Sequence, residues 1–197
     1  MAKRELKNIF LSASIPLPER DPKYSATADI IAIRDSIIAL ATAVLPRNRL
    51  VWGGHPSITP LINFVLTRLK LNIQQHVTLY QSRFFESNFP EDNNKFENVI
   101  LTDSLKTKEE SLKLMRKTML TSCEFNAGVF IGGMEGVEEE YQMFKETNPK
   151  ALVLPLVSTG AAARIIYDNF FQDSQNLCLE KDYAYMSLFQ KHLLDKI

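Results

Sequence analysis

Short apolar runs that end in glycine or small polar residues alternate along this chain with longer segments of helical periodicity. Residues 127–131 form one such run without any polar residue, which is typical of a parallel strand buried on both faces. Because strands alternate with helices, we predict right-handed βαβ units and an α/β, Rossmann-like three-layer fold with a mostly parallel central sheet. The predicted strands are residues 8–12, 50–52, 76–80, 98–101, 127–131 and 151–157. The pattern does not fix their order in the sheet.

Helical segments follow most of the predicted strands. Residues 27–45 carry isoleucine, alanine and valine at helical spacing, and Pro46 ends the segment. Ser57 is placed to cap a helix that runs to residue 69, whereas the polar stretch 81–95 is predicted as a loop. The remaining helices are predicted at residues 105–121, 137–147 and 161–167, and from about residue 183. With 197 residues the chain can bury one substantial core, so we expect a single domain over residues 1–197.

Charge and cysteine content argue against several kinds of function. Lysine plus arginine equals aspartate plus glutamate at 23 each, so no overall field favours nucleic acid or an anionic membrane. Cys123 and Cys178 lack the spacing of a zinc site or a disulfide framework, and His55, beside Pro56, is predicted as a turn residue rather than a metal ligand. No apolar stretch approaches the roughly 20 residues of a membrane helix, and the N-terminal one is too short for a signal peptide. We therefore expect a cytoplasmic protein without metal or cofactor, with both cysteines as free thiols.

Small residues and glycines gather at the ends of four predicted strands. In an open α/β sheet, ligands bind beyond the carboxyl ends of the strands, where loops lead into helices. Glycine lets the backbone approach a phosphate and lets N–H groups converge on it at the positive end of a helix. These turns predict a nucleotide site that includes Ser12, Ala13, Ser14, Gly53, Gly54, Gly132, Gly133, Met134, Glu135, Gly136, Ser158, Thr159 and Gly160. The competing explanation is that a tight turn needs glycine for its backbone conformation alone.

Two charged side chains at the same edge of the sheet are candidates for direct contact with a nucleotide. Arg83 follows the third predicted strand and could pair with a phosphate while an aromatic neighbour stacks on a base. Glu135, within the glycine turn, could accept a hydrogen bond from a ribose hydroxyl. The chain has no GxGxxG or GxxxxGKS/T motif, so neither a dinucleotide dehydrogenase nor a P-loop ATPase is supported. It has no GxSxG elbow either, so a nucleophilic triad has no support.

The segment 131–141 reads Ile-Gly-Gly-Met-Glu-Gly-Val-Glu-Glu-Glu-Tyr and follows the apolar run at 127–131. It resembles the PGGxGTxxE signature of the LOG phosphoribohydrolases and, more widely, the SLOG superfamily, which includes DprA-like DNA-processing proteins and ligand-sensing domains of bacterial defence systems. Gly53-Gly54 matches the place of an earlier glycine turn in that superfamily. The resemblance covers the chain from the first strand to the last helix, and its specific motifs occupy a few turns.

In LOG enzymes an arginine upstream of the glycine motif and the glutamate of the motif form the catalytic pair. The resemblance implies Arg116 and Glu140 for these roles, with the carboxylate stabilising an oxocarbenium-like transition state and the guanidinium holding a phosphate. Two alternatives stay open at these positions. Arg116, on a charged amphipathic helix, could be a solvated surface residue, and residues 138–140 could simply favour the positive end of their helix.

The sequence also departs from the enzyme signature. Ile131 replaces its proline, Val137 replaces its threonine, and one additional residue, Met134 or Glu135, lengthens the turn between the glycines. The longer form looks like the SLOG branches associated with TIR, STING and other conflict-system proteins. That resemblance implies a domain that senses a nucleotide-derived second messenger, NAD-derived or cyclic ADP-ribose-like, and acts in antiviral defence as a homo-oligomer or through a fused or partner effector.

Two alternatives to the sensor remain open at this point. The first is a LOG-like N-glycosidase that cleaves nucleoside monophosphates, and the second is an interaction module with a vestigial pocket. Nucleic-acid binding of the DprA kind is not expected, because the chain has no excess of basic residues.

Overall fold

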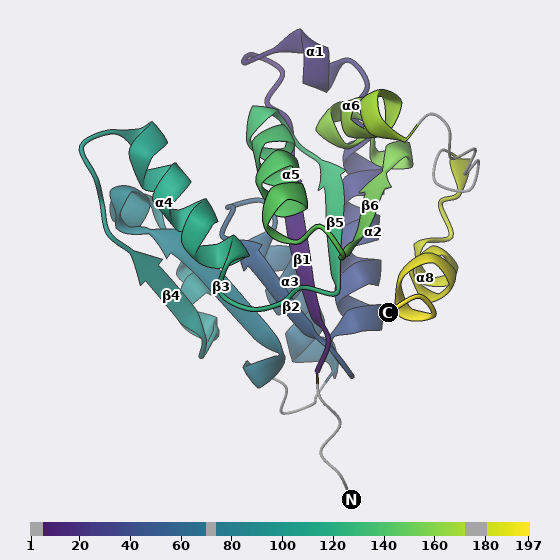
Figure 1. Ribbon diagram of the computed structural model, residues 1–197, viewed down its shortest axis with the longest axis horizontal. Helices are drawn as coiled ribbons and strands as arrows, with labels where there is room; N and C mark the ends of the chain where they lie inside the picture. Colours follow the sequence, from purple (N-terminus) through teal and green to yellow (C-terminus); the bar gives the residue numbers. More distant parts are fainter. Residues whose placement is uncertain (1–5, 70–73, 172–180) are drawn as a thin grey trace, which may run out of the picture.

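The computed structural model describes residues 6–69, 74–171 and 181–197, and these form a six-stranded sheet in the order β4-β3-β2-β1-β5-β6 (Figure 1). Every neighbouring pair of strands in this sheet is parallel. All six predicted strands are confirmed, and the sheet is wholly rather than mostly parallel. The strands are β1 (Asn8–Ser14), β2 (Arg49–Gly53), β3 (Val77–Ser82), β4 (Val99–Thr102), β5 (Ala127–Gly132) and β6 (Leu152–Leu156).

The direction in which the chain adds strands to the sheet reverses between β1 and β5. The chain first adds β2, β3 and β4 outward from β1, and then crosses back to place β5 on the other side of β1. At the carboxyl end of this central pair, Ser14 lies opposite Gly132. In open α/β sheets such a switch point leaves a crevice between the loops that leave the two strands in opposite directions. The topology therefore places a ligand site beyond the ends of β1 and β5.

Helices cover both faces of the sheet and complete the predicted three-layer fold (Figure 1). One face carries α2 (Ile30–Val44), α3 (Thr59–Leu69) and the short α8 (Tyr185–Phe189), which packs on α2. The opposite face carries α4 (Lys108–Leu120), α5 (Glu135–Thr147) and α6 (Ala161–Phe170). A further short helix, α1 (Pro22–Ser25), lies in the loop after β1. Right-handed crossovers require helices on opposite faces once the direction of strand addition reverses.

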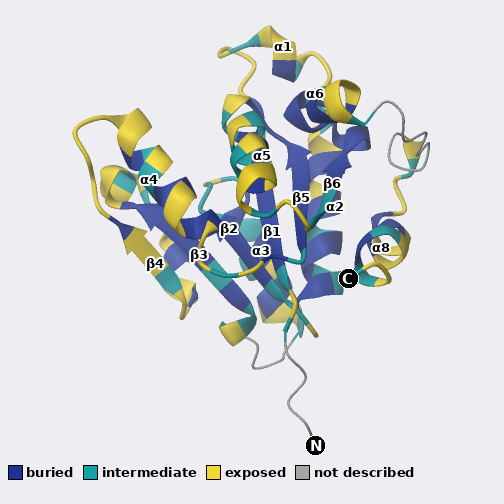
Figure 2. Cartoon of the chain, in the orientation of Figure 1, coloured by how far each residue is buried: buried dark blue, intermediate teal, exposed yellow. Residues whose placement is uncertain are grey.

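Side chains along each strand alternate between two cores, one on each face of the sheet. In β1, Phe10 points toward α5, where its ring stacks on Phe144 with 5.3 Å between the ring centroids. Ile9 and Leu11 point the other way, into the core that includes α2. Figure 2 shows that the central strands are buried between helices whose outer sides are exposed, whereas the edge strand β4 is partly exposed. The strand ends that carry the candidate site are therefore fixed by packing on both faces.

Several element boundaries differ from the predicted ones for local reasons. The turn before α3 is built on His55, whose ring nitrogen Nδ1 accepts a hydrogen bond of 3.2 Å from the Ser57 amide. Helix α4 begins after Thr107, which forms a capping box with Glu110, and α5 begins two residues earlier than expected. The predicted loop at 81–95 contains the end of β3 and two 3₁₀ helices, Arg83–Asn88 and Glu91–Lys95.

The structure also bears on the expectations about free thiols, membrane helices and metal sites. Cys123 is a free thiol, whereas Cys178 lies outside the described residues. Within residues 6–69, 74–171 and 181–197, no helix combines the length and apolar character needed to cross a bilayer. The same ranges hold no group of three or more metal-ligating side chains.

Candidate functional site

A pocket of about 300 Å³ opens beyond the carboxyl ends of β1 and β2, against the first turn of α5. We call it the strand-end pocket. It brings together two glycine turns that are far apart in the sequence, one after β2 and one after β5. The predicted site residues that line it are Ala13, Ser14, Gly53, Gly54, Arg116, Met134, Glu135, Gly136 and Glu140. Most of the predicted site therefore lies around one hollow at the switch point of the sheet.

Gly132 and Gly133 shape the turn without lining the pocket. Both have positive φ angles, +54° and +86°, which favour glycine. Their amides are already used, because Gly132 N donates to Thr159 Oγ1 and Gly133 N donates to the Ser14 carbonyl, each at 2.9 Å. The backbone conformation alone therefore explains why glycine occupies positions 132 and 133.

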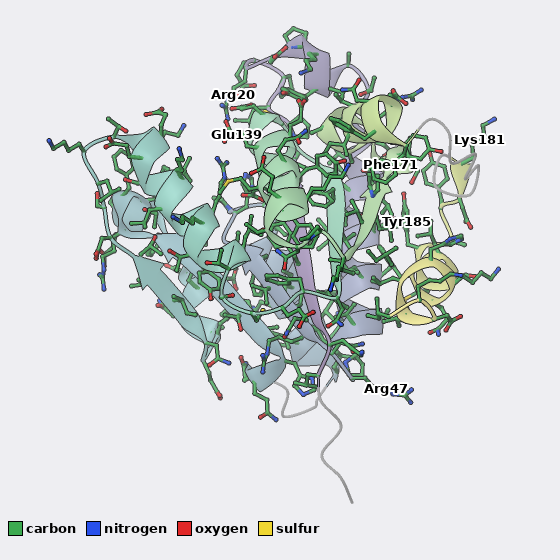
Figure 3. All side chains as sticks on the ribbon, viewed as in Figure 1. Arg20, Arg47, Glu139, Phe171, Lys181 and Tyr185 are labelled. Carbon is green, nitrogen blue, oxygen red and sulfur yellow. The ribbon has the colours of Figure 1, made fainter. Side chains whose placement is uncertain are left out.

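The predicted residues at the end of β6 lie elsewhere. Ser158 contacts the hydroxyl of Tyr185 at 3.1 Å, and Thr159 is fully buried beneath the glycine turn. Gly160 packs against the backbone of Thr27. Figure 3 shows Tyr185 near α8, well away from Arg20 and Glu139. The structure does not bring residues 158–160 to the pocket.

Arg83 also lies apart from the strand-end pocket. Its Nη1 is 3.1 Å from the Glu86 carboxylate, within the same 3₁₀ helix, and both side chains are largely exposed. Its neighbour Phe85 does line the pocket, so the aromatic residue rather than the arginine of this loop reaches the site.

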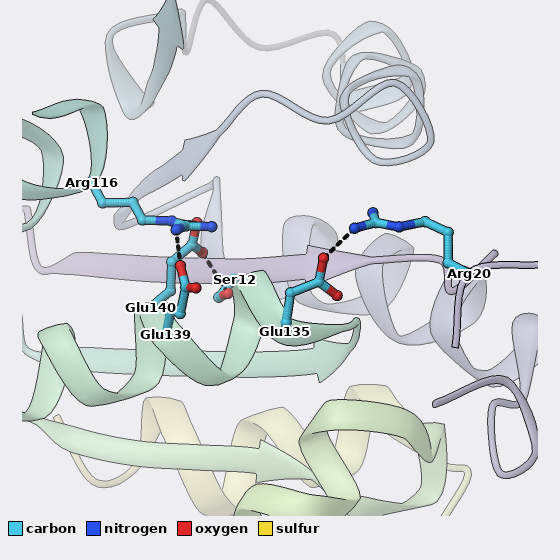
Figure 4. Close-up of polar contacts among 6 residues, drawn as sticks. All are labelled: Ser12, Arg20, Arg116, Glu135, Glu139 and Glu140. Carbon is cyan, nitrogen blue, oxygen red and sulfur yellow. Dashed lines mark hydrogen bonds and ion pairs between the residues drawn. The ribbon is translucent and has the colours of Figure 1, made fainter. Parts of the chain in front are cut away.

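Arg116 and Glu140 lie in direct contact at the pocket wall (Figure 4). Nε of Arg116 is 3.3 Å from Oε1 of Glu140, and Oε2 accepts a hydrogen bond of 2.6 Å from the Ser12 hydroxyl. Only 11% of the Arg116 side chain and 14% of the Glu140 side chain are exposed. A second ion pair joins Arg116 to Glu139. This burial excludes the alternative that Arg116 is a solvated surface residue.

Burial raises the pKa of Glu140 above that of an ordinary glutamate. The positive charge of Arg116 and the hydrogen bond from Ser12 act against this rise, and the net direction is upward. Such a carboxyl exchanges its proton closer to neutral pH than an exposed glutamate does, which is a property of groups used in acid–base catalysis.

The first turn of α5 faces the strand-end pocket with open backbone donors. No side chain caps this helix at Met134, and the first helical bonds are donated by the amides of Val137 and Glu138. The amides of Glu135 and Gly136 have no acceptor within the described residues. Open amides at the positive end of a helix attract anions. Beside them, a side chain on Gly136 would come within 2.8 Å of Nη2 of Arg116, so this glycine gives the guanidinium room.

The predicted site omitted eight residues that line the pocket, of which four are apolar (Leu11, Leu112, Met115 and Val137) and four are polar or aromatic. Arg20, from the loop after β1, lines the pocket and forms an ion pair with Glu135 (Figure 4). Lys108, His55 and Phe85 line it as well. Their positions just after predicted strands were a usable signal for Arg20, His55 and Phe85. Lys108 gives no such signal, because it begins a charged helix that reaches the pocket only in the folded chain.

The His55 ring, which lines the pocket, is uncharged at neutral pH. Burial lowers its pKa below the ordinary histidine value. Because Nδ1 accepts the hydrogen bond from the Ser57 amide, the proton of the neutral imidazole lies on Nε2. The pocket wall therefore includes an uncharged N–H donor beside Gly54.

An all-parallel sheet with a hollow at its switch point, an open helix start and a buried arginine–glutamate pair defines a Rossmann-like protein with a ligand pocket. The model of one family, described as the SLOG cluster3 family, matches residues 23–193. The chain therefore belongs to the SLOG cluster3 family, which confirms the predicted membership of the SLOG superfamily. This membership points to a nucleotide-related function. No curated protein matches the chain.

Proposed function

We propose that this chain is a sensor domain that binds a nucleotide-derived signal in the strand-end pocket. The observation that carries the proposal is the meeting of uncapped helix-start amides, cationic side chains and an apolar wall in one pocket. The lengthened glycine turn, through its resemblance to conflict-system SLOG domains, favours an NAD-derived or cyclic ADP-ribose-like signal in a defence pathway. The bound state would then act on a partner or on a second copy of the chain.

The phosphate of the ligand fits against the first turn of α5. Arg116 directs Nε to Glu140 and Nη1 to Glu139, which leaves the Nη2 donors beside Gly136 for an anion. Arg20 and Lys108 line the same pocket and add positive charge. Figure 4 shows the Arg116 and Arg20 guanidinium groups reaching over α5 from opposite sides. Charge-assisted hydrogen bonds of this kind are the strong ones in proteins.

The base and the ribose fit the rest of the pocket. Leu11, Met115 and Met134 provide apolar surface, and the Phe85 ring can stack on a base. His55 supplies a neutral donor, and Glu135 can accept a hydrogen bond from a ribose hydroxyl. The pocket thus combines apolar side chains with polar groups that can fix the orientation of a ligand, as small-molecule sites do.

The second candidate function is hydrolysis of the N-glycosidic bond of a nucleoside monophosphate. It is favoured by the contact between Arg116 and Glu140 at the pocket wall, because this is the pair that the LOG resemblance implies. The sensor is preferred because both carboxylate oxygens of Glu140 already accept hydrogen bonds, one from Ser12 and one from Arg116. In this arrangement Glu140 holds its neighbours in place.

A ligand screen with a product assay distinguishes the two functions. With ligand at 100 times its dissociation constant, we expect stabilisation by about 2.7 kcal/mol, or about 5 to 10 °C in the melting temperature. The panel contains nucleoside monophosphates, NAD and cyclic ADP-ribose isomers, and chromatography monitors release of free base. A shift without free base supports the sensor. Free base whose release is lost in Glu140→Ala supports the hydrolase, and a panel in which no member gives either a shift or free base contradicts both.

Two cations in the loop after β1 provide a matched test of the phosphate position. Arg20 pairs with Glu135 and Lys23 pairs with Glu138, and their side chains are 44% and 51% exposed, but only Arg20 lines the pocket. We expect Arg20→Ala to weaken binding of an anionic ligand about tenfold, since it removes a charge-assisted hydrogen bond. Lys23→Ala is expected to leave the affinity unchanged. Calorimetric titration measures both, and equal effects would place the phosphate elsewhere.

A further inference from the structure

A second hollow of about 550 Å³ runs between α4 and α5, next to the strand-end pocket. We call it the helix groove. The two hollows are contiguous, because both are lined by Lys108, Leu112, Arg116, Glu135 and Gly136. The helix groove, at about 550 Å³, is larger than the strand-end pocket of about 300 Å³ that the proposed function uses.

Most of the groups shared by the two hollows are suited to an anion, whereas Leu112 is apolar and the Glu135 carboxylate pairs with Arg20. The groups that suit an anion include two cationic side chains, Lys108 and Arg116, and the open helix start at Glu135 and Gly136. A phosphate held there stands at the junction, with the strand-end pocket on one side and the helix groove on the other. A ligand that uses both hollows must then carry one organic group on each side of its phosphates.

The part of the groove beyond the junction has a different chemistry from the strand-end pocket. Met143 provides apolar surface next to the shared Leu112. Glu109, Glu139 and Gln142 provide carboxylate and amide oxygens, and Lys113 adds a positive charge. Carboxylate oxygens accept hydrogen bonds from vicinal hydroxyls, and apolar side chains pack on the C–H face of a sugar ring. The phenyl and imidazole groups that suit a base, Phe85 and His55, line only the other hollow.

We infer that the helix groove is a second subsite, which binds a sugar attached beyond the phosphates of the nucleotide. The ligand class is then a nucleoside diphosphate ester, with its nucleoside in the strand-end pocket, its diphosphate at the junction and its terminal sugar between α4 and α5. This inference rests on the proposed function, since it requires a nucleotide in the strand-end pocket.

The test compares ligands that differ by one part, for adenine, guanine, uracil and cytosine in turn. The probes are the nucleoside monophosphate, the nucleoside diphosphate and the corresponding diphosphate glucose, with ADP-ribose added for adenine. We expect the sugar ester of the preferred base to bind about tenfold more tightly than its diphosphate, measured by calorimetric titration. The diphosphate serves as the control for charge alone.

Two tryptophan variants of α5 locate the sugar. Gln142 is exposed and lines the groove, whereas Glu146 is exposed one helical turn further on and lies outside it. Gln142→Trp is expected to weaken the sugar ester about tenfold and to leave the monophosphate within about twofold, while Glu146→Trp changes neither. Thermal melts of both variants verify folding.

The other possible results contradict either the second subsite alone or the proposed function as well. If the monophosphate binds but the sugar ester binds no more tightly than the diphosphate, the second subsite is wrong and the proposed function stands. The same holds if Gln142→Trp does not affect the sugar ester. If no probe of any class binds, the proposed function fails and the second subsite fails with it.

Discussion

Arg116→Met is expected to lower the free energy of unfolding by about 3 kcal/mol at neutral pH, because it leaves a carboxylate without its cation in a nearly buried position. Glu140 is the group affected, and Ser12 would remain its hydrogen-bond donor. Urea denaturation measures the loss. Lys117→Met, an exposed neighbour on α4, is the matched control and is expected to stay within about 0.5 kcal/mol of the parent.

The loss caused by Arg116→Met is expected to depend on pH. The pKa of Glu140 in the folded chain is raised above the ordinary value of 4.5 by burial, and removal of Arg116 takes away the main opposing influence. A raised pKa contributes stability that is fully present below the unfolded pKa and is lost as the pH rises through the folded pKa. The variant should therefore be weakest at neutral pH and approach the parent below about pH 4.5, where Glu140 is protonated.

A double variant separates charge from packing in this pair. Arg116→Met with Glu140→Gln removes both charges, so it is expected to recover most of the stability lost in Arg116→Met alone. A loss of equal size at neutral and acidic pH, with no recovery in the double variant, would show that Arg116 acts through the packing of its side chain.

Gly160→Ala is expected to cost about 3 kcal/mol or more, or to prevent folding. Gly160 has φ +68° and ψ −155°, a region that only glycine populates readily. A β-carbon there would lie 1.8 Å from the carbonyl oxygen of Thr27. Because that oxygen belongs to the backbone, the loop before α2 would have to move. Chemical denaturation, or the soluble yield if the variant does not fold, measures the effect.

Gly136→Ala is the control for Gly160→Ala. Gly136 lies inside the first turn of α5 at a φ that alanine also adopts, and the nearest atom to a new β-carbon is the end of the Arg116 side chain. Since alanine is the better helix former, its stability is expected to stay within about 1 kcal/mol of the parent. If Gly160→Ala proved as stable as Gly136→Ala, the backbone explanation for Gly160 would be wrong.

The predictions that rest on local pattern agree with the structure. The apolar run at 127–131 predicted a fully buried strand, and β5 is buried along its whole length. Alternation of strands and helices was enough to predict the α/β class. Apolar residues recur about every 2 residues in a half-buried strand and about every 3.6 in an amphipathic helix, so each element can be identified from its own sequence. The turn at Gly53 and Gly54 and the one at 134–136 were also visible, since both follow strands directly.

The sequence did not distinguish glycines that face a pocket from glycines that satisfy the backbone. Gly132, Gly133 and Gly160 have positive φ, whereas Gly53 and Gly136 line the strand-end pocket. For Gly132 and Gly133 the difference depends on the acceptor that each amide meets. Those acceptors, Thr159 Oγ1 in the 3₁₀ helix after β6 and the Ser14 carbonyl at the end of β1, come from other segments of the chain. A turn motif read alone contains no information about such partners.

By itself, then, the sequence determined the strands, the helices and the edge of the sheet where a ligand site belongs, because those features follow from the local spacing of apolar residues and glycines. Only the tertiary structure decided that β5 pairs with β1, and that pairing brings Ser12 and Arg20 to Glu140 and Glu135, which are 128 and 115 residues away in the chain. The physical reason is that these contacts form only once the strand order is set, and the strand order depends on how helices on both faces pack together.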